Sequence, residues 1–263
     1  MKSLFRAVLT MAFFLGATAS IFSQSYGVRV ETVAENIGIL TPASGDPVDL
    51  IGHNTYRLYA TAVNADDFVS AVYGNSDNPT NISTTTSFFQ SIIGGAMAAS
   101  ANPLLFAVYP DLEYDSWFTI GLEGPANPTA GEQDTQQATS PSQNFSAIFD
   151  PGAGADGSNL VIDDLIGGTW FVLNTASNGV AGADLEVLIG QFTTDGEFSG
   201  EVNIQFFEHG AGGATIISAD TFAADDEGCV NDLDGDGICD EDEIDGCTDA
   251  TSCNYNDAAT DDD

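Results

Sequence analysis

The stretch from Leu185 to Phe206 reads Leu-Glu-Val-Leu-Ile-Gly-Gln-Phe-Thr-Thr-Asp-Gly-Glu-Phe-Ser-Gly-Glu-Val-Asn-Ile-Gln-Phe. Apolar residues recur at every second position on both sides of the Asp195-Gly196 pair: Leu185, Val187 and Ile189 before it, then Val202, Ile204 and Phe206 after it. A period of two is typical of a strand with one buried face, and Asp-Gly between two such runs favours a tight turn. The stretch therefore predicts a β-hairpin.

The same period extends over most of residues 25–224. Tyr56, Leu58, Ala60 and Ala62 alternate with polar residues, and further strand candidates are Phe68 to Tyr73, Ile82 to Phe89, Phe145 to Phe149 and Trp170 to Leu173. Turn clusters rich in Gly, Asn, Asp and Pro separate these runs, and only Ser87 to Ala99 has the composition of a short helix. Many short strands with such turns predict an all-β fold, an antiparallel β-sandwich or jelly roll.

Residues 1–24 have the organisation of a secretory signal peptide. Lys2 and Arg6 form a basic start, an apolar run from Ala7 to Ile21 follows, and small residues before Gln24 offer cleavage points. No later stretch of sequence stays apolar over the roughly 18 residues that a membrane span requires. We expect the mature chain to be exported whole, to an extracellular or cell-surface location; a retained N-terminal anchor is the alternative.

The charge of the chain is strongly one-sided. Forty acidic residues stand against four basic ones, for a net charge of -36, and the mature chain keeps only Arg29 and Arg57 as basic residues. Such a surface repels phosphate backbones and anionic lipid headgroups, so nucleic acids and membrane surfaces are excluded as partners. An acidic surface also keeps a protein soluble in salty water, whatever its task.

Residues 232–243 carry the spacing of a calcium-binding loop, D-x-D-x-D-G-x5-E. Calcium takes six to eight oxygen ligands, and a glycine at the sixth position permits the tight turn that brings alternate carboxylates together. The predicted ligands are Asp232, Asp234, Asp236, the backbone carbonyl of Ile238, Asp240 and Glu243. Seven carboxylates in twelve residues repel one another, so we expect the loop to be ordered only with the cation bound. A solvated acidic tail is the alternative.

The residues around this loop define a separate tail, 225–263. Glycines and aspartates on both sides weaken the helices that an EF-hand requires. All four cysteines of the chain lie here, at Cys229, Cys239, Cys247 and Cys253. An even number of cysteines behind a leader fits disulfides, with three pairings left open, whereas the spacing does not suit zinc.

These tail residues resemble the thrombospondin type 3 repeat, in which aspartate-rich loops wrap calcium and disulfides staple them. The segment from Gly246 to Asp263 also resembles a cysteine-bearing repeat of very large secreted proteins of marine bacteria, which implies that further repeats follow. The body resembles a domain of the same proteins through Tyr56 to Tyr59, Asp67 to Gly74 and Tyr114 to Gly121. The resemblance implies an extracellular setting and no particular chemistry.

Signals for catalysis are weak. Residues 152–157 spell G-x-G-x-x-G, but no predicted helix follows, so a flexible loop is favoured over a dinucleotide site. His53 and His209 are the only histidines, and no nucleophile motif accompanies them. Acidic neighbours that a glycosidase would use occur at Asp163-Asp164, Glu113 with Asp115, and Glu123, and so acidic a chain produces such neighbours by chance.

The sequence thus predicts a secreted, non-catalytic, calcium-binding structural or adhesion protein. Calcium is the expected ligand, and a surface polysaccharide or matrix protein is the expected class of partner. The first alternative is a carbohydrate-binding module that uses Trp117 and Trp170, although both lie in apolar contexts that favour a core position. The second is a secreted polysaccharide hydrolase.

Overall fold

The computed structural model describes residues 25–43, 45–144, 146–153, 156–210 and 215–224. These residues form thirteen strands, one α-helix of four residues, α1 (Ser146–Phe149), and seven short 3-10 helices. The protein is therefore predominantly β, as the alternating pattern predicts. The predicted signal peptide at 1–24 and the tail at 225–263, with its predicted calcium loop and its cysteines, lie outside the described residues.

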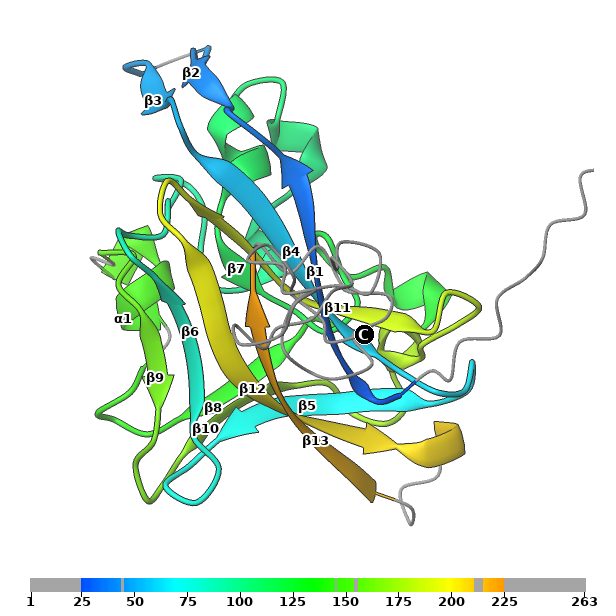
Figure 1. The fold of residues 1–263 in the computed structure, drawn as a ribbon. Coiled ribbons are helices and arrows are strands. Elements are labelled where there is room, and N and C mark those ends of the chain that lie inside the picture. Colours follow the sequence, from blue (N-terminus) through cyan, green and yellow to red (C-terminus); the bar gives the residue numbers. More distant parts are fainter. Residues whose placement is uncertain (1–24, 44, 145, 154–155, 211–214, 225–263) are drawn as a thin grey trace, which may run out of the picture.

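The first sheet has four strands in the order β1-β4-β11-β7, all paired antiparallel. They are β1 (Gly27–Ala34), β4 (Asn54–Thr61), β11 (Glu186–Thr194) and β7 (Trp117–Phe118). A small antiparallel pair, β2 (Gly38–Leu40) and β3 (Val48–Leu50), projects beyond this sheet at the top of Figure 1. Tyr56, Leu58 and Ala60 on β4 are buried, which confirms the predicted inner face of that strand.

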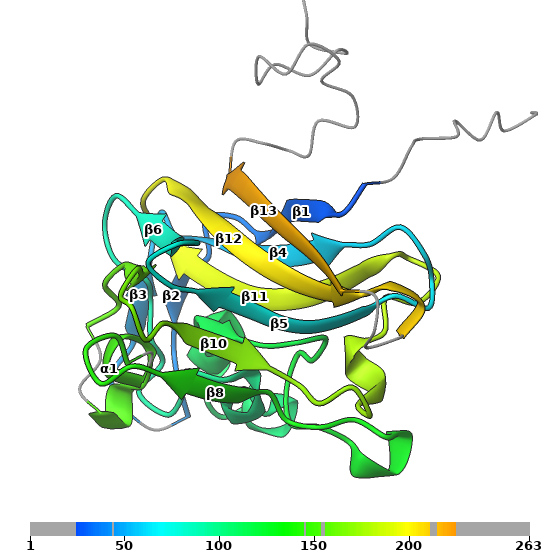
Figure 2. The ribbon, with the colours of Figure 1, turned by 90° about the horizontal axis from the view of Figure 1, so that it is seen from below.

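The second sheet is built around β12 (Phe198–Phe207), which pairs with β13 (Thr215–Ala223) along one edge. Along its other edge β12 pairs first with β6 (Thr80–Thr84) and then with β5 (Phe68–Gly74). β9 (Leu160–Ile162) continues the sheet beside β6, and β10 (Gly168–Phe171) and β8 (Gln136–Thr139) continue it beside β5. Figure 2 shows β13, β12, β5, β10 and β8 in this order.

The predicted hairpin is half right. Both strands form, as β11 and β12, but they do not pair with each other: β11 belongs to the first sheet and β12 to the second. The turn at Asp195-Gly196 carries the chain across the sandwich, where the rings of Phe192 and Phe198 stack at 5.2 Å. The alternation of apolar and polar residues specifies which face of a strand is buried, but it does not specify which strand pairs with it through hydrogen bonds.

Four further predictions of local structure need correction. Residues 146–149, predicted as part of a strand, form α1. The strand predicted to end at Phe89 ends at Thr84, and the strand predicted to end at Leu173 ends at Phe171. Residues 87–99, predicted as a helix, form a loop with one 3-10 turn. The backbone N–H groups of Phe88 and Phe89 bond Gly157 O and Thr193 O instead, at 2.7 Å each, so tertiary contacts replace the helical hydrogen bonds.

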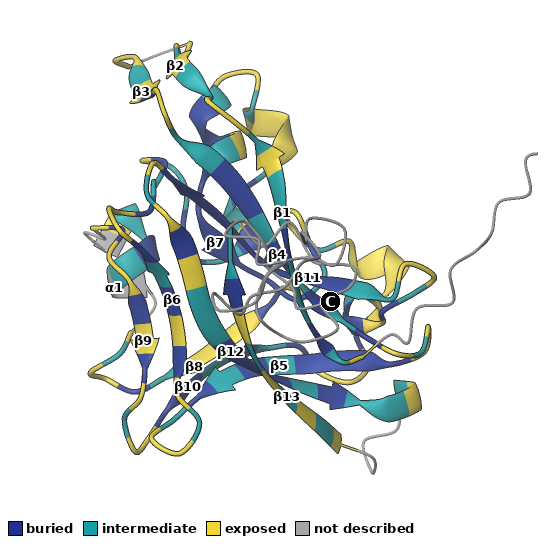
Figure 3. Ribbon diagram, in the orientation of Figure 1, coloured by how far each residue is buried: buried dark blue, intermediate teal, exposed yellow. Residues whose placement is uncertain are grey.

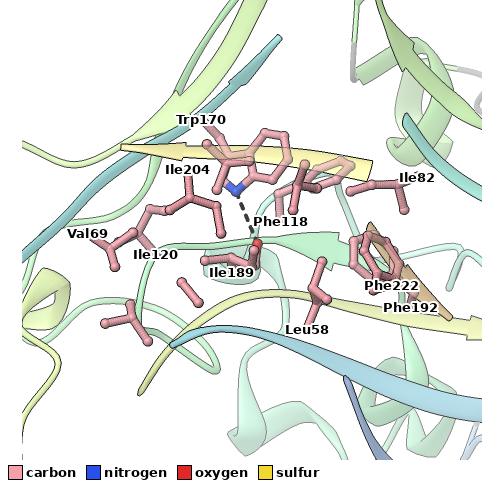
Figure 4. Packing of buried hydrophobic residues seen from close by; sticks show 14 of the residues in the cluster. Leu58, Val69, Ile82, Phe118, Ile120, Trp170, Ile189, Phe192, Ile204 and Phe222 are labelled. Atoms are coloured by element: carbon pink, nitrogen blue, oxygen red, sulfur yellow. Dashed lines mark hydrogen bonds between the residues drawn. The ribbon is translucent and has the colours of Figure 1, made fainter. Parts of the chain in front are cut away.

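The core between the two sheets is rich in aromatic rings, as Figure 4 shows. Trp170 on β10 is fully buried against Phe118, with ring centroids 4.8 Å apart. Its indole N–H donates to the backbone carbonyl of Ile189 on β11 at 3.1 Å, and this hydrogen bond joins the two sheets. Trp170 is therefore a core residue that a glycan cannot contact.

A second, smaller cluster covers the outer face of the first sheet. Trp117 packs there with Leu188, Ala98 and Ala101, and Tyr59 lies against them. Trp117 is 1% exposed, so it too is unable to stack on a glycan. Because this cluster lies on the far side of β11 from the main core, β11 is buried on both faces (Figure 3).

Candidate functional site

The ligands predicted for calcium all lie outside the described residues. They are Asp232, Asp234, Asp236, Ile238, Asp240 and Glu243. The calcium loop and the disulfides of the tail therefore stay predictions.

An open groove lies on the outer face of the second sheet. Its floor follows a cross-strand row in which Ile217 on β13 faces Gln205 on β12, Gln205 faces Ala71 on β5, and Ala71 faces Phe171 on β10. Small side chains at Ser70 and Ala71 leave the hollow between the larger ones, and its volume is about 530 Å³. The groove is within the size range of small-ligand sites, although it is open to solvent along its length.

The groove is lined by aromatic and uncharged polar side chains. Tyr73, Phe171 and Phe207 supply partly exposed rings, and Ser70, Thr169, Asn174 and Gln205 supply hydroxyl and amide groups. No acidic or basic side chain lines it among the described residues. On a chain with forty acidic residues, this is a neutral surface that suits an uncharged ligand.

One polar group of the groove is held in place by the protein. Ser70 Oγ donates to Gln205 Oε1 at 2.7 Å, which fixes the orientation of the Gln205 amide. The amide nitrogen of Gln205 is then directed away from Ser70 and remains a donor for a ligand. A flat ring beside a fixed amide donor can bind both the apolar face and the hydroxyl edge of one molecule.

The carboxylates considered for acid-base catalysis lie apart. Glu113 is exposed, whereas Asp115 is fully buried. Glu123 forms an ion pair with Arg57 at 2.9 Å. Asp164 caps a turn: Ser140 and Ser142 donate to its Oδ2 and Gly167 N to its Oδ1, and these hydrogen bonds lower the pKa of Asp164 to about 2. Asp115, Glu123 and Asp164 thus each have a structural partner.

His209, Asp66 and Asp67 form a cluster whose ligand atoms lie within 4.8 Å of one another. His209 Nδ1 is 2.8 Å from Asp66 Oδ1, and this contact raises the pKa of the histidine. Asp67 accepts hydrogen bonds at both oxygens, from backbone and side-chain donors. Because those donors occupy its lone pairs, we interpret the cluster as structural and not as a metal site.

The remaining motifs also have structural explanations. Residues 152–157 follow no strand-to-helix turn: Pro151–Ala153 is a 3-10 helix, and the described residues contain no α-helix longer than four residues. Gly157, at φ +67°, exchanges backbone hydrogen bonds with Phe88 and Ile148, which ties this loop to the sandwich. His53 lies half-buried with its ring edge against Phe89.

Within the described ranges, the helices are too short to reach across a lipid bilayer. Comparison of the chain with family models, with curated proteins and with solved structures gave no significant match.

Proposed function

We propose that this chain is an exported, non-catalytic structural or adhesion protein in which a β-sandwich carries a calcium-binding tail. The observation that carries the proposal is the spacing of residues 232–243, because random acidity does not place the glycine and the spacer residues in register. Bound calcium would offset carboxylate repulsion and turn the tail into an ordered spacer.

The way the tail joins the sandwich supports this role. The tail follows directly on β13, and β13 pairs with β12 at every position from Ser199↔Ala223 to Phe207↔Thr215. A pull on the tail is therefore transmitted to a continuous ladder of backbone hydrogen bonds between β13 and β12, at the edge of the second sheet. Such an attachment suits a module that must stay folded when force is applied to it in a surface or matrix assembly.

Removal of calcium is expected to expand the tail and leave the sandwich folded. Small-angle scattering should show a larger radius of gyration in chelator than in millimolar calcium, and limited proteolysis should become faster at residues 225–263 only. Asp234→Asn should weaken the calcium response at least tenfold, because it removes a charged ligand, whereas Asp261→Asn outside the loop should not. Identical scattering and proteolysis in both buffers would rule out the spacer.

The groove favours a second candidate function, the binding of a neutral carbohydrate chain. Trp117 and Trp170, on which this alternative first depended, are buried, but Tyr73, Phe171 and Phe207 take their place on an open face. Sugar rings present an apolar face of C–H groups and an edge of hydroxyls. Partly exposed aromatic rings beside amides offer a matching surface.

Replacement of the groove rings is expected to remove any such binding. Phe171→Ala and Tyr73→Ala should each lower the affinity for a neutral glycan selected on an array by at least about tenfold, since each removes an anchor ring. Leu104→Ala changes an apolar residue that is even more exposed and lies outside the groove, so it should have no effect. Absence of binding on a broad array, or binding that survives both substitutions, would count against this function.

A further inference from the structure

We infer that the sandwich itself holds a second divalent-cation site, independent of the tail, at the buried carboxyls of Asp111 and Asp115. Asp111 lies in the 3-10 helix η3 (Pro110–Tyr114), and Asp115 follows it directly, just before β7. Calcium is the cation that the oxygen ligands here would favour.

The two carboxyls converge on one residue of the loop that precedes them. Ser91 donates its hydroxyl to Asp111 Oδ2 at 2.7 Å and its backbone N–H to Asp115 Oδ1 at 2.8 Å. Gly95 N donates to Asp115 Oδ2 at 3.2 Å, and a side chain at Gly94 would collide with that same oxygen. The loop from Ser91 to Gly95 thus closes tightly over both acids.

This arrangement buries two acidic groups, and no basic side chain of the described residues is paired with them. Asp111 is 2% exposed and Asp115 is 0% exposed. In the described part of the chain, Arg57 forms its ion pair with Glu123 and Arg29 forms its ion pairs with Glu31 and Glu186. Buried carboxylates are costly unless they are paired or coordinate a metal, so something must neutralise this pair.

Open oxygen atoms mark where a cation would bind. Asp111 Oδ1 is buried and has no hydrogen-bond partner among the described residues, and the same holds for Gln90 Oε1. The amide nitrogen of Gln90 bonds Ser116 O at 3.4 Å, which places this amide at the residue that follows Asp115. A buried acceptor without a partner calls for a water or an ion, and the charge of the pair favours the ion.

The chemistry of the donors selects the kind of cation. Every candidate ligand is an oxygen: the carboxyls of Asp111 and Asp115, the amide oxygen of Gln90 and the hydroxyl of Ser91. Oxygen-only sets suit calcium and magnesium, whereas zinc prefers nitrogen and sulfur. Burial raises the pKa of Asp115 to about 8, with Asp111 adding to the effect, so a proton is the competing occupant.

Terbium luminescence separates this site from the tail. Terbium binds in place of calcium and emits when a nearby tryptophan is excited. The only tryptophans, Trp117 and Trp170, lie in the sandwich, and Trp117 is two residues from Asp115. Full-length protein excited where tyrosine does not absorb should show sensitised emission that calcium displaces. No such emission, or emission that calcium leaves unchanged, would overturn the inference.

Variants assign the signal to this pair. Asp111→Asn should weaken terbium binding at least tenfold, because it removes one of two charged ligands. Glu113→Gln removes the same charge from an exposed position on the same helix and should leave the emission unchanged. Asp234→Asn in the tail should leave it unchanged as well, so that this result stands apart from the fate of the proposed spacer. Equal emission from Asp111→Asn and wild type would overturn the assignment.

Thermal unfolding of the sandwich adds a test that a purely structural role would fail. In calcium, wild type should melt at a higher temperature than in chelator, while Asp111→Asn should show no such shift. In chelator, Asp111→Asn should be at least as stable as wild type, since it replaces a buried carboxyl with a neutral group that keeps an oxygen acceptor for Ser91. A variant that is equally destabilised in both buffers would mean that Asp111 serves only as a hydrogen-bond acceptor for Ser91.

Discussion

Trp170→Ala is expected to lower the free energy of unfolding of the sandwich by about 3–5 kcal/mol, as is typical when a buried tryptophan is truncated. The indole is fully buried and packs on Phe118 in the main core. Its loss leaves a cavity at the point where β10 of one sheet lies over β11 of the other. Chemical denaturation followed by near-ultraviolet circular dichroism would measure the loss.

Two further variants separate packing from hydrogen bonding at this position. Trp170→Phe keeps most of the ring and removes the indole donor to Ile189 O. That carbonyl still accepts from Thr119 N at 3.1 Å, so the substitution should cost only about 0.5–1.5 kcal/mol, the usual net contribution of one hydrogen bond. Phe171→Ala changes the neighbouring ring on the open face and should cost less than Trp170→Ala. Equal losses for Trp170→Ala and Phe171→Ala would contradict the assignment of Trp170 to the core.

The sequence predicted which faces of the strands are buried better than it predicted which strands pair. Val202, Ile204 and Phe206 all point into the core, as their alternation requires. The neighbour of each strand depends on contacts between residues far apart in the chain, and a turn signal at Asp195-Gly196 carries no information about them. The alternation of apolar and polar residues could therefore not predict that β12 pairs with β13 instead of β11.

The sequence alone did not predict the groove, because residues from four strands line it. Tyr73, Phe171 and Phe207 are aromatic residues at outward positions of three neighbouring strands. Once the strand order is known, this placement indicates a candidate binding surface. Trp117 and Trp170 lie in apolar runs, and this context correctly predicts a core position for both. Both are fully buried, because large rings in apolar runs fill cores.

The buried acidic pair shows how local geometry changes which residues are neighbours. Spacing in an assumed strand pairs Asp115 with Glu113, two positions away. The chain instead forms the 3-10 helix Pro110–Tyr114, which exposes Glu113 and buries Asp111 with Asp115. The predicted calcium loop at 232–243 can be recognised from the sequence alone, because all its predicted ligands lie in twelve consecutive residues.

Asp67→Asn is expected to cost about 3 kcal/mol, because one buried carboxylate holds three segments together. Its oxygens accept hydrogen bonds from Tyr26 Oη at 3.0 Å, Asn64 N at 2.8 Å and His209 N at 2.8 Å. These donors come from the residue before β1, the turn before β5 and the 3-10 helix that follows β12. An amide would place its NH₂ group against some of these N–H and O–H donors. Asp66→Asn, the exposed neighbour with the same charge change, should cost less than about 0.5 kcal/mol.

The effect of Asp67→Asn should also depend on pH. Burial alone would raise the pKa of Asp67, but the hydrogen bonds from His209 and Asn64 outweigh it and lower that pKa below its ordinary value. A lowered pKa in the folded state means that this stabilisation is full above the ordinary aspartate range and is lost as pH falls through the lowered pKa. The difference in unfolding free energy between wild type and Asp67→Asn should therefore shrink in acid.

The alkaline side offers an independent check on the same hydrogen bond. Burial, together with the bond to Asp67, raises the pKa of Tyr26 to about 12. Folding therefore favours the neutral phenol, and its contribution should be lost as pH rises from the ordinary tyrosine value of about 10 toward 12. Absorbance titration of Tyr26→Phe against wild type would identify this phenol. If the difference between wild type and Asp67→Asn stayed constant from pH 7 into acid, the carboxylate would not be the group that joins these three segments.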